Sequence, residues 1–247
     1  MNSSIQIIST FNLALAFIPV AVVLIILYKW SLDSANAFYA VVRMLVQLLL
    51  VGYVLTSIFH AESAWLVVAV MLVMVTAASW IALGTIKEKR TQLFRHAFWS
   101  ILCGGGVTLL LVTQGVISLE PWFEPQYMIP LAGMIFANSM NSVSLAAERL
   151  HAEMQRDVPY AQARTIAFNA AFIPVVNSLF AVGLVALPGM MTGQILSGVS
   201  PIIAAHYQIV VMCMIFGSAG LSTAYFLVLT KSTFTQEENQ TQHIRNC

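Results

Sequence analysis

The sequence predicts an all-α, polytopic membrane protein with about seven transmembrane helices. Hydrophobic residues make up 59% of the 247 positions, whereas charged residues make up only 9%. Soluble domains average about 25% charged residues, so a water-soluble protein of this length would lack the polar groups that cover a surface. The apolar residues also gather into runs of roughly 20, the length that a helix needs to cross the hydrocarbon core.

Five apolar runs can each form one span, and the charge-free stretch 165–230 is long enough for two. We expect its bend near 187–189 and 198–201, where helix-breaking residues cluster. The expected spans are 11–28, 35–59, 64–86, 97–118, 127–147, 166–187 and 203–230. They form a single transmembrane domain over residues 1–231, with a short polar tail at 232–247.

The basic residues predict the orientation, because loops on the cytosolic side of a membrane are enriched in Lys and Arg. If the N-terminus lies outside and the C-terminus lies in the cytoplasm, ten of the 11 Lys and Arg residues fall on inner segments. The eleventh, Arg43, lies about two turns into the second span and can snorkel to the inner face. The outer segments carry the acids Glu62, Glu120 and Glu124 and no basic residue. We therefore expect a multi-pass protein of the cell inner membrane.

Residues 148–165 form a polar segment between two apolar regions, and this orientation places them in the cytosol. Asp157 can cap a helix whose first turn contains Pro159, and the following residues, 160–163, are small or favour a helix. The segment therefore predicts a short amphipathic helix that lies on the inner face and fits a groove on a partner protein. An ordinary solvated loop is the alternative.

The chain has no evident energy source for transport. All ten acids fall in loops or at span ends, whereas a proton- or sodium-coupled carrier usually keeps a carboxylate deep in the membrane. A G-x-x-x-x-G-K-[ST] phosphate-binding loop is missing, since Lys231-Ser232 is the only K-[ST] pair and lacks the required glycines. Uphill transport would therefore need ATP hydrolysed by a separate subunit, which the 148–165 segment could contact.

Polar side chains inside the spans are candidates for a substrate path. Asn138 and Asn141 share a face of the fifth span, and Asn177 in the sixth could extend the same polar stripe. Arg43 and Gln47 share a face of the second span and are candidates for the same path. Because amides in hydrocarbon must find partners, hydrogen bonds between helices are the alternative interpretation.

The stretch L-P-G-M-M-T-G at 187–193 interrupts an apolar run. Broken helices at membrane depth are tolerated where they line a cavity. The thioethers of Met190 and Met191 could bind a soft metal, although the same pattern suits an outer hairpin packed by methionines, so we assign no metal ligand. A second small-residue stretch, Gly104-Gly105-Gly106, predicts close contact between helices.

Three stretches together resemble the FetB family of ABC-transporter permeases, which are iron exporters and resemble the plant aluminium-tolerance permeases. They are R-x-x-x-Q-L-x-x-V-G-Y at 43–53, I-P-L-A-G-M-I at 129–135 and L-P-G-M-M-T-G at 187–193. The resemblance implies a permease that dimerises and exports iron or another metal as part of metal homeostasis. It also implies two copies of a soluble ATP-binding cassette subunit, with ATP bound there, no covalent cofactor on this chain and no nucleic-acid partner.

The family approaches its coupling helix through G-A-[TS]-P, whereas residues 156–159 here read R-D-V-P and lack that glycine. The residues expected to contact the ATPase are Asp157, Pro159, Tyr160, Gln162 and Arg164.

Other functions remain open at this stage. The chain could be an ABC permease for a non-metal solute such as a sugar nucleotide, or a channel or sensor without ATP coupling. An intramembrane serine protease using Ser218 and His206 is disfavoured, because twelve residues along one helix are roughly 18 Å apart. We therefore expect a transport subunit with no catalytic residues.

Overall fold

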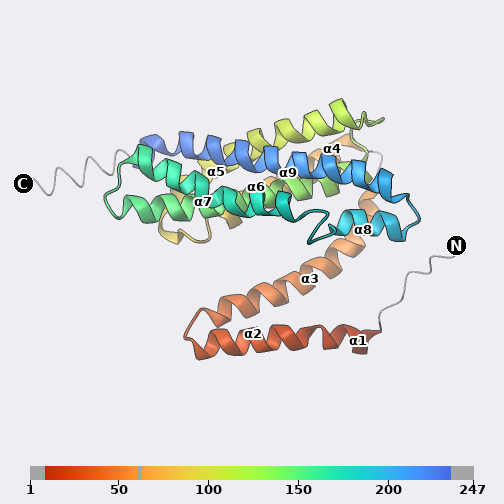
Figure 1. The fold of residues 1–247 in the computed structure, drawn as a ribbon, viewed down its shortest axis with the longest axis horizontal. Coiled ribbons are helices and arrows are strands. Elements are labelled where there is room, and N and C mark those ends of the chain that lie inside the picture. The colour runs from red at the N-terminus through yellow and green to blue at the C-terminus, as the bar shows by residue number, and fades with distance from the viewer. Residues whose placement is uncertain (1–8, 60–62, 235–247) are drawn as a thin grey trace, which may run out of the picture. The chain divides into compact units, whose positions relative to one another are not determined.

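The computed structural model describes residues 9–59 and 63–234, and these residues form helices and turns with no β-strand beyond one isolated bridge (Figure 1). The chain divides into two compact units, Met1–Glu62 and Ser63–Cys247, which we describe separately. The helices are α1 (Thr10–Leu15), α2 (Phe17–Lys29), α3 (Ser34–Phe59), α4 (Ala64–Ala82), η1 (Lys87–Lys89), α5 (Arg90–Leu110), η2 (Leu111–Val116), α6 (Pro125–Met154), α7 (Tyr160–Ala181), α8 (Gly189–Leu196) and α9 (Pro201–Leu229). Most of the polar tail lies outside the described residues.

The N-terminal unit contains α1, α2 and α3. The Ser9 hydroxyl accepts from the Asn12 N–H at 3.2 Å at the start of α1, and Asp33 Oδ1 accepts from the Asn36 N–H at 3.0 Å at the start of α3. Such caps satisfy N–H groups that a helix start leaves unpaired. The large apolar side chains of α2 are mostly exposed within the unit, as expected of helices that face lipid or other helices.

The C-terminal unit is a bundle of α4, α5, α6, α7 and α9, with the short α8 beside the start of α9 (Figure 1). The central helix is α6, which packs against the other four long helices, and α9 packs against α5, α6 and α7. The core of the bundle contains fully buried side chains such as Leu150, Met214 and Phe226. The long helices therefore begin and end at two opposite ends of the bundle, and the turns that connect them lie at those ends.

Two of the three consecutive glycines in α5 make the close helix contact that their sequence predicted. A Cβ on Gly104 would lie 2.5 Å from the Ser222 hydroxyl, and a Cβ on Gly105 would lie 2.9 Å from Ile135 Cγ2. A Cβ on Gly106 would meet nothing within 4 Å. At the same contact, the buried Ser222 hydroxyl donates to the Ser139 hydroxyl at 3.2 Å, which satisfies two polar groups inside the bundle.

The expected all-α membrane architecture is confirmed. Among the described residues, 6 helices are long and apolar enough to cross a membrane, and together they cover six of the seven expected spans. The remaining span corresponds to α6, which has 30 residues and is therefore about 45 Å long. That exceeds the roughly 30 Å hydrocarbon core, so its polar C-terminal turns can extend beyond it.

Several expected helix boundaries differ from the structure, including the start of the fourth span, which is expected at 97 whereas α5 begins at Arg90. The sixth span was placed at 166–187, but α7 runs from Tyr160 to Ala181 and α8 follows at Gly189–Leu196. The fifth was placed at 127–147, but α6 continues to Met154. The earlier starts of α5 and α7 and the later end of α6 have one cause: a hydropathy pattern ends where charges begin, whereas a helix can continue through charged residues that favour helical structure. The earlier end of α7 at Ala181 has a different origin, because no charged residue lies near it.

Candidate functional site

The basic residues gather at one end of the C-terminal bundle, where α5 and α7 begin and α6 and α9 end. The Tyr160 hydroxyl of α7 donates a short hydrogen bond to the Leu227 carbonyl of α9. The Lys89 ammonium lies 4.5 Å from the centroid of the Phe234 ring, which joins the start of α5 to the end of α9. We call this region the basic end; its residues are Lys87, Lys89, Arg90, Arg95, Arg149, Arg156, Arg164 and Lys231.

The 148–165 segment is built differently from the expected surface helix. Its first half is the end of α6, and residues 160–165 are the start of α7, so no separate helix lies between them. The connecting turn is closed by hydrogen bonds from the Val158 N–H to the Glu153 carbonyl and from the Asp157 N–H to the Met154 carbonyl, both 3.2 Å. Asp157 has a φ of 60°, and this left-handed residue with two such bonds is a Schellman motif.

The sequence suggested Asp157 as the N-cap of α7, but in the structure Asp157 ends α6 and a different residue occupies that position. The N-cap position of α7 is Pro159, whose side chain makes no capping hydrogen bond. An N-cap residue needs extended backbone angles, which the left-handed conformation of Asp157 excludes. The sequence could not distinguish the two roles, because Asp is compatible with both a helix start and a left-handed helix end.

The five residues expected to contact an ATPase are divided by their exposure. Asp157, Pro159, Gln162 and Arg164 are exposed at the turn and along the first turn of α7. Tyr160 is only 7% exposed, because its ring is packed in the bundle and its hydroxyl reaches the Leu227 carbonyl. Tyr160 can therefore hold α7 against α9, whereas the other four are accessible to a partner.

The structure adds Glu153, which the sequence reasoning did not single out. Its carboxylate is buried, and its Oε1 lies 2.7 Å from Arg149 Nη2 and 3.6 Å from Arg156 Nη1. The spacing to these two arginines, i−4 and i+3, was a usable signal in the sequence. Because the Glu153 carbonyl also accepts the hydrogen bond that closes the turn, this residue fixes the turn through both its backbone and its side chain.

The residues expected along a substrate path are not gathered into one cavity. The Asn138 amide donates to the Met134 carbonyl in its own helix at 2.8 Å, whereas Asn141 and Asn177 are exposed on the surface of the C-terminal unit. Arg43 and Gln47 are exposed on α3 of the N-terminal unit. Their role in a substrate path therefore stays a prediction.

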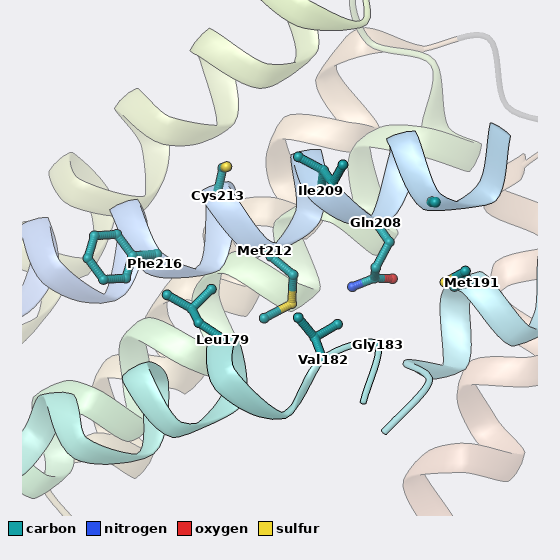
Figure 2. A pocket seen from close by; sticks show the side chains of 10 residues that line it. Leu179, Val182, Gly183, Met191, Gln208, Ile209, Met212, Cys213 and Phe216 are labelled. Carbon is teal, nitrogen blue, oxygen red and sulfur yellow. The ribbon is translucent and has the colours of Figure 1, made fainter. Parts of the chain in front are cut away.

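Two cavities adjoin α8 at the end of the bundle opposite the basic end. The first, of about 480 Å³, lies between α7, α8 and α9 (Figure 2). The second, of about 540 Å³, adjoins α6, α8 and α9. Met191 lines the first and Met190 the second, so consecutive methionines of the 187–193 stretch contribute to different cavities.

One polar group in the first cavity is unusual. Gln208 is 5% exposed, and its carbonyl oxygen has no hydrogen-bond partner among the described residues. Figure 2 shows its amide directed into the cavity, on the same side of α9 as Met212. The described residues contain no group of three His, Cys, Asp or Glu side chains that could hold a metal ion. The cavity thus offers an apolar wall, thioethers and one unused hydrogen-bond acceptor.

Comparison with known proteins decides the family. A family model described as Uncharacterised protein family (UPF0014) matches residues 9–164 and 155–235, and thus nearly all of the chain. The chain belongs to the UPF0014 family. The two matched parts overlap at 155–164, which contains the turn between α6 and α7.

Named relatives of this UPF0014 chain come from bacteria and plants. It is 36% identical over 250 residues to "Probable iron export permease protein FetB" of Escherichia coli, covering 93% of both chains. It is 36% identical to "UPF0014 membrane protein slr1647" of Synechocystis, covering 82% of this chain and 83% of that protein. It is also 30% identical to "Protein ALUMINUM SENSITIVE 3" of Arabidopsis thaliana, covering 93% and 88%. No solved structure matches. The resemblance to the FetB family is therefore confirmed, and the chain is a multi-pass membrane protein of permease type.

Proposed function

We propose that this chain is the membrane-spanning permease subunit of an ABC transporter that exports iron or another metal across the inner membrane. A separate soluble subunit binds and hydrolyses the ATP. The observation that carries the proposal is the 36% identity, over 93% of both chains, to the Escherichia coli protein named as an iron export permease.

The turn between α6 and α7 is the proposed contact with the ATPase. It is short, closed by two backbone hydrogen bonds and held by the buried Glu153 carboxylate, so a force applied there passes directly into two long helices. Pro159, Gln162 and Arg164 are exposed on it and offer a partner both shape and charge. Two permease copies and two ATPase copies would form the transporter, since such assemblies are usually symmetric.

A binding experiment tests the coupling surface. The double variant Gln162→Glu/Arg164→Glu reverses the charge of the exposed first turn of α7, so it should abolish co-purification with the ATPase subunit. Glu120→Lys is the matched control, because it changes an exposed charge far along the sequence from the turn and should leave binding intact. Unchanged ATPase binding by the double variant, with an unchanged melting temperature, would contradict the proposed contact.

A flux experiment tests the transport activity. Vesicles containing both subunits should show ATP-dependent movement of Fe²⁺ or another metal, and none when the ATPase is left out. Sugar nucleotides serve as the comparison solutes, since their transport in place of metals would assign a different substrate. Uphill transport by the permease alone would overturn the ATP-coupled mechanism.

A further inference from the structure

A cleft of about 520 Å³ lies between α5 and α9 at the basic end. It belongs to neither of the cavities beside α8, and the proposed transport function does not use it. Its lining residues are Gln92, Arg95, His96, Trp99, Tyr225 and Leu229. This cleft combines a cationic side chain with aromatic and aliphatic side chains, which the cavities beside α8 do not.

The α5 residues of the cleft follow a helical stripe. Gln92, Arg95, His96 and Trp99 are spaced i, i+3, i+4 and i+7, so they lie on one face of the helix. The stripe is polar at Gln92, cationic at Arg95 and aromatic at Trp99, over about 10 Å at 1.5 Å per residue. The opposite wall is formed by two residues of α9 that are spaced i, i+4, the aromatic Tyr225 and the aliphatic Leu229. Along the α5 wall the cleft therefore changes from polar to aromatic with distance from the start of the helix.

No acidic side chain among the described residues neutralises the cationic charge of the cleft. None of the lining residues is acidic, and Arg95 makes no ion pair among the described residues. In the same part of the structure, Glu153 is already occupied by Arg149 and Arg156. The cleft thus contains a cationic side chain with no counter-ion among the described residues.

The depth of the cleft in the membrane fits an amphipathic ligand. Helix α5 and its extensions run through 87–116, about 45 Å, so the first part of this stretch lies near or outside the hydrocarbon boundary. Trp and Tyr are enriched at that boundary, and long basic side chains extend from it toward the headgroups. Trp99 and Tyr225 are both partly exposed in the cleft, as boundary aromatics are.

We propose that this cleft binds a phospholipid with an anionic headgroup. The phosphate contacts the Arg95 guanidinium and the Gln92 amide, and an acyl chain extends from there along Trp99 and Tyr225. Guanidinium groups bind phosphate through paired N–H donors, and basic pockets between membrane helices bind anionic headgroups. The proposal is independent of the transported solute, because it rests on the cleft alone.

The test uses the full chain purified in detergent, titrated with phosphatidylglycerol or with phosphatidylcholine of the same acyl chains. Phosphatidylglycerol should raise the melting temperature of the wild-type chain more than phosphatidylcholine does. Arg95→Gln should weaken phosphatidylglycerol binding about tenfold, because it removes one charged hydrogen-bond contact with the headgroup. Lys87→Gln is the matched control, because it removes the same charge from an exposed position outside the cleft and should bind normally.

Three results would overturn the proposal: equal stabilisation by the two lipids, equal weakening by Arg95→Gln and Lys87→Gln, or the same stabilisation by inorganic phosphate alone. The last result would assign a free anion site in place of a lipid site. If Arg95→Gln does not fold, tryptophan quenching by brominated lipids provides a second measurement. Brominated phosphatidylglycerol should quench the wild-type chain more than brominated phosphatidylcholine, and Trp99→Phe should lose that difference; an unchanged difference would contradict the site.

Discussion

The two ends of the C-terminal bundle differ in the bonds that join their helices and in their cavities, although a buried polar atom without a hydrogen-bond partner among the described residues occurs at both, including Arg149 Nε at the basic end. At the basic end, Tyr160 is bonded to a backbone carbonyl and Glu153 to two arginines. At the opposite end, the carbonyl oxygens of Gln194 and Gln208 have no partner among the described residues, and both residues line cavities. Satisfied buried groups hold a structure rigid, whereas unsatisfied ones beside a cavity mark space for a ligand or for movement. Under the proposed function, the joined helix ends of the basic end transmit force and the cavities of the opposite end are the place for a solute.

The largest expected effect is on the glycine contact in the middle of the bundle, which links the two ends. Gly104→Ala places a Cβ within 3 Å of both the side chain and the backbone of Ser222, so α5 and α9 must separate. We expect a loss of about 3 kcal/mol or failure to fold. Gly106→Ala is the matched control, since its Cβ meets nothing within 4 Å and alanine favours a helix. Thermal unfolding in detergent measures both variants; equal stabilities would mean that the helices are not in close contact.

The second-largest loss of stability is expected when the buried carboxylate of Glu153 at the basic end is replaced. Glu153→Gln removes the charge facing Arg149 and Arg156, which should cost about 1–2 kcal/mol, less than for fully buried pairs because both arginines are partly exposed. The ATPase activity stimulated by the permease should fall further than stability does, because the turn loses its fixed shape. Glu148→Gln, an exposed acid on the same helix, is the control. If the two variants behave alike, Glu153 does not order the turn.

A smaller effect is expected for the hydrogen bond between α7 and α9. Tyr160→Phe keeps the packed ring but removes the donor to the Leu227 carbonyl, which should cost about 1 kcal/mol. Tyr127→Phe is the control, because its ring is exposed on α6. Melting temperatures in detergent check the difference; a Tyr160→Phe variant as stable as wild type would show that the ring alone joins the helices.

The smallest effect on stability should come from the opposite end. Gln208→Leu replaces an amide whose carbonyl has no partner with an apolar side chain, so stability should change by less than about 0.5 kcal/mol or increase. If the first cavity serves the transported solute, flux should nevertheless fall. A loss of stability as large as that of Tyr160→Phe would contradict the contrast between the two ends.

Much of the fold was predictable, because hydropathy reports directly on burial in lipid. The starts of α3 and α4 lie within one residue of the predicted starts of the second and third spans. The close contact of Gly104 and Gly105 also followed from their small size. The site was less predictable: Tyr160 was expected on a contact surface but is buried, and Met190 and Met191 were considered as a pair but line different cavities.

These errors have a common physical origin. Which face of a helix turns inward depends on the neighbours against which it packs, and consecutive residues point about 100° apart on a helix. The polarity of Tyr is compatible with either face, so only the position of the Leu227 carbonyl decides that Tyr160 is inside. Glu153 was overlooked for the same reason, since an acid near a span end looks solvated until its two arginines are placed around it.

The sequence by itself determined the class of the protein, the approximate spans, the placement of basic residues and the family, because each depends on residue type summed along the chain. Tertiary structure alone decided that the turn after α6 is closed by a left-handed Asp157, that Tyr160 faces inward, and that cavities lie beside α8 and between α5 and α9. Those features depend on which side chains from distant helices meet, and no local pattern of residues encodes that meeting.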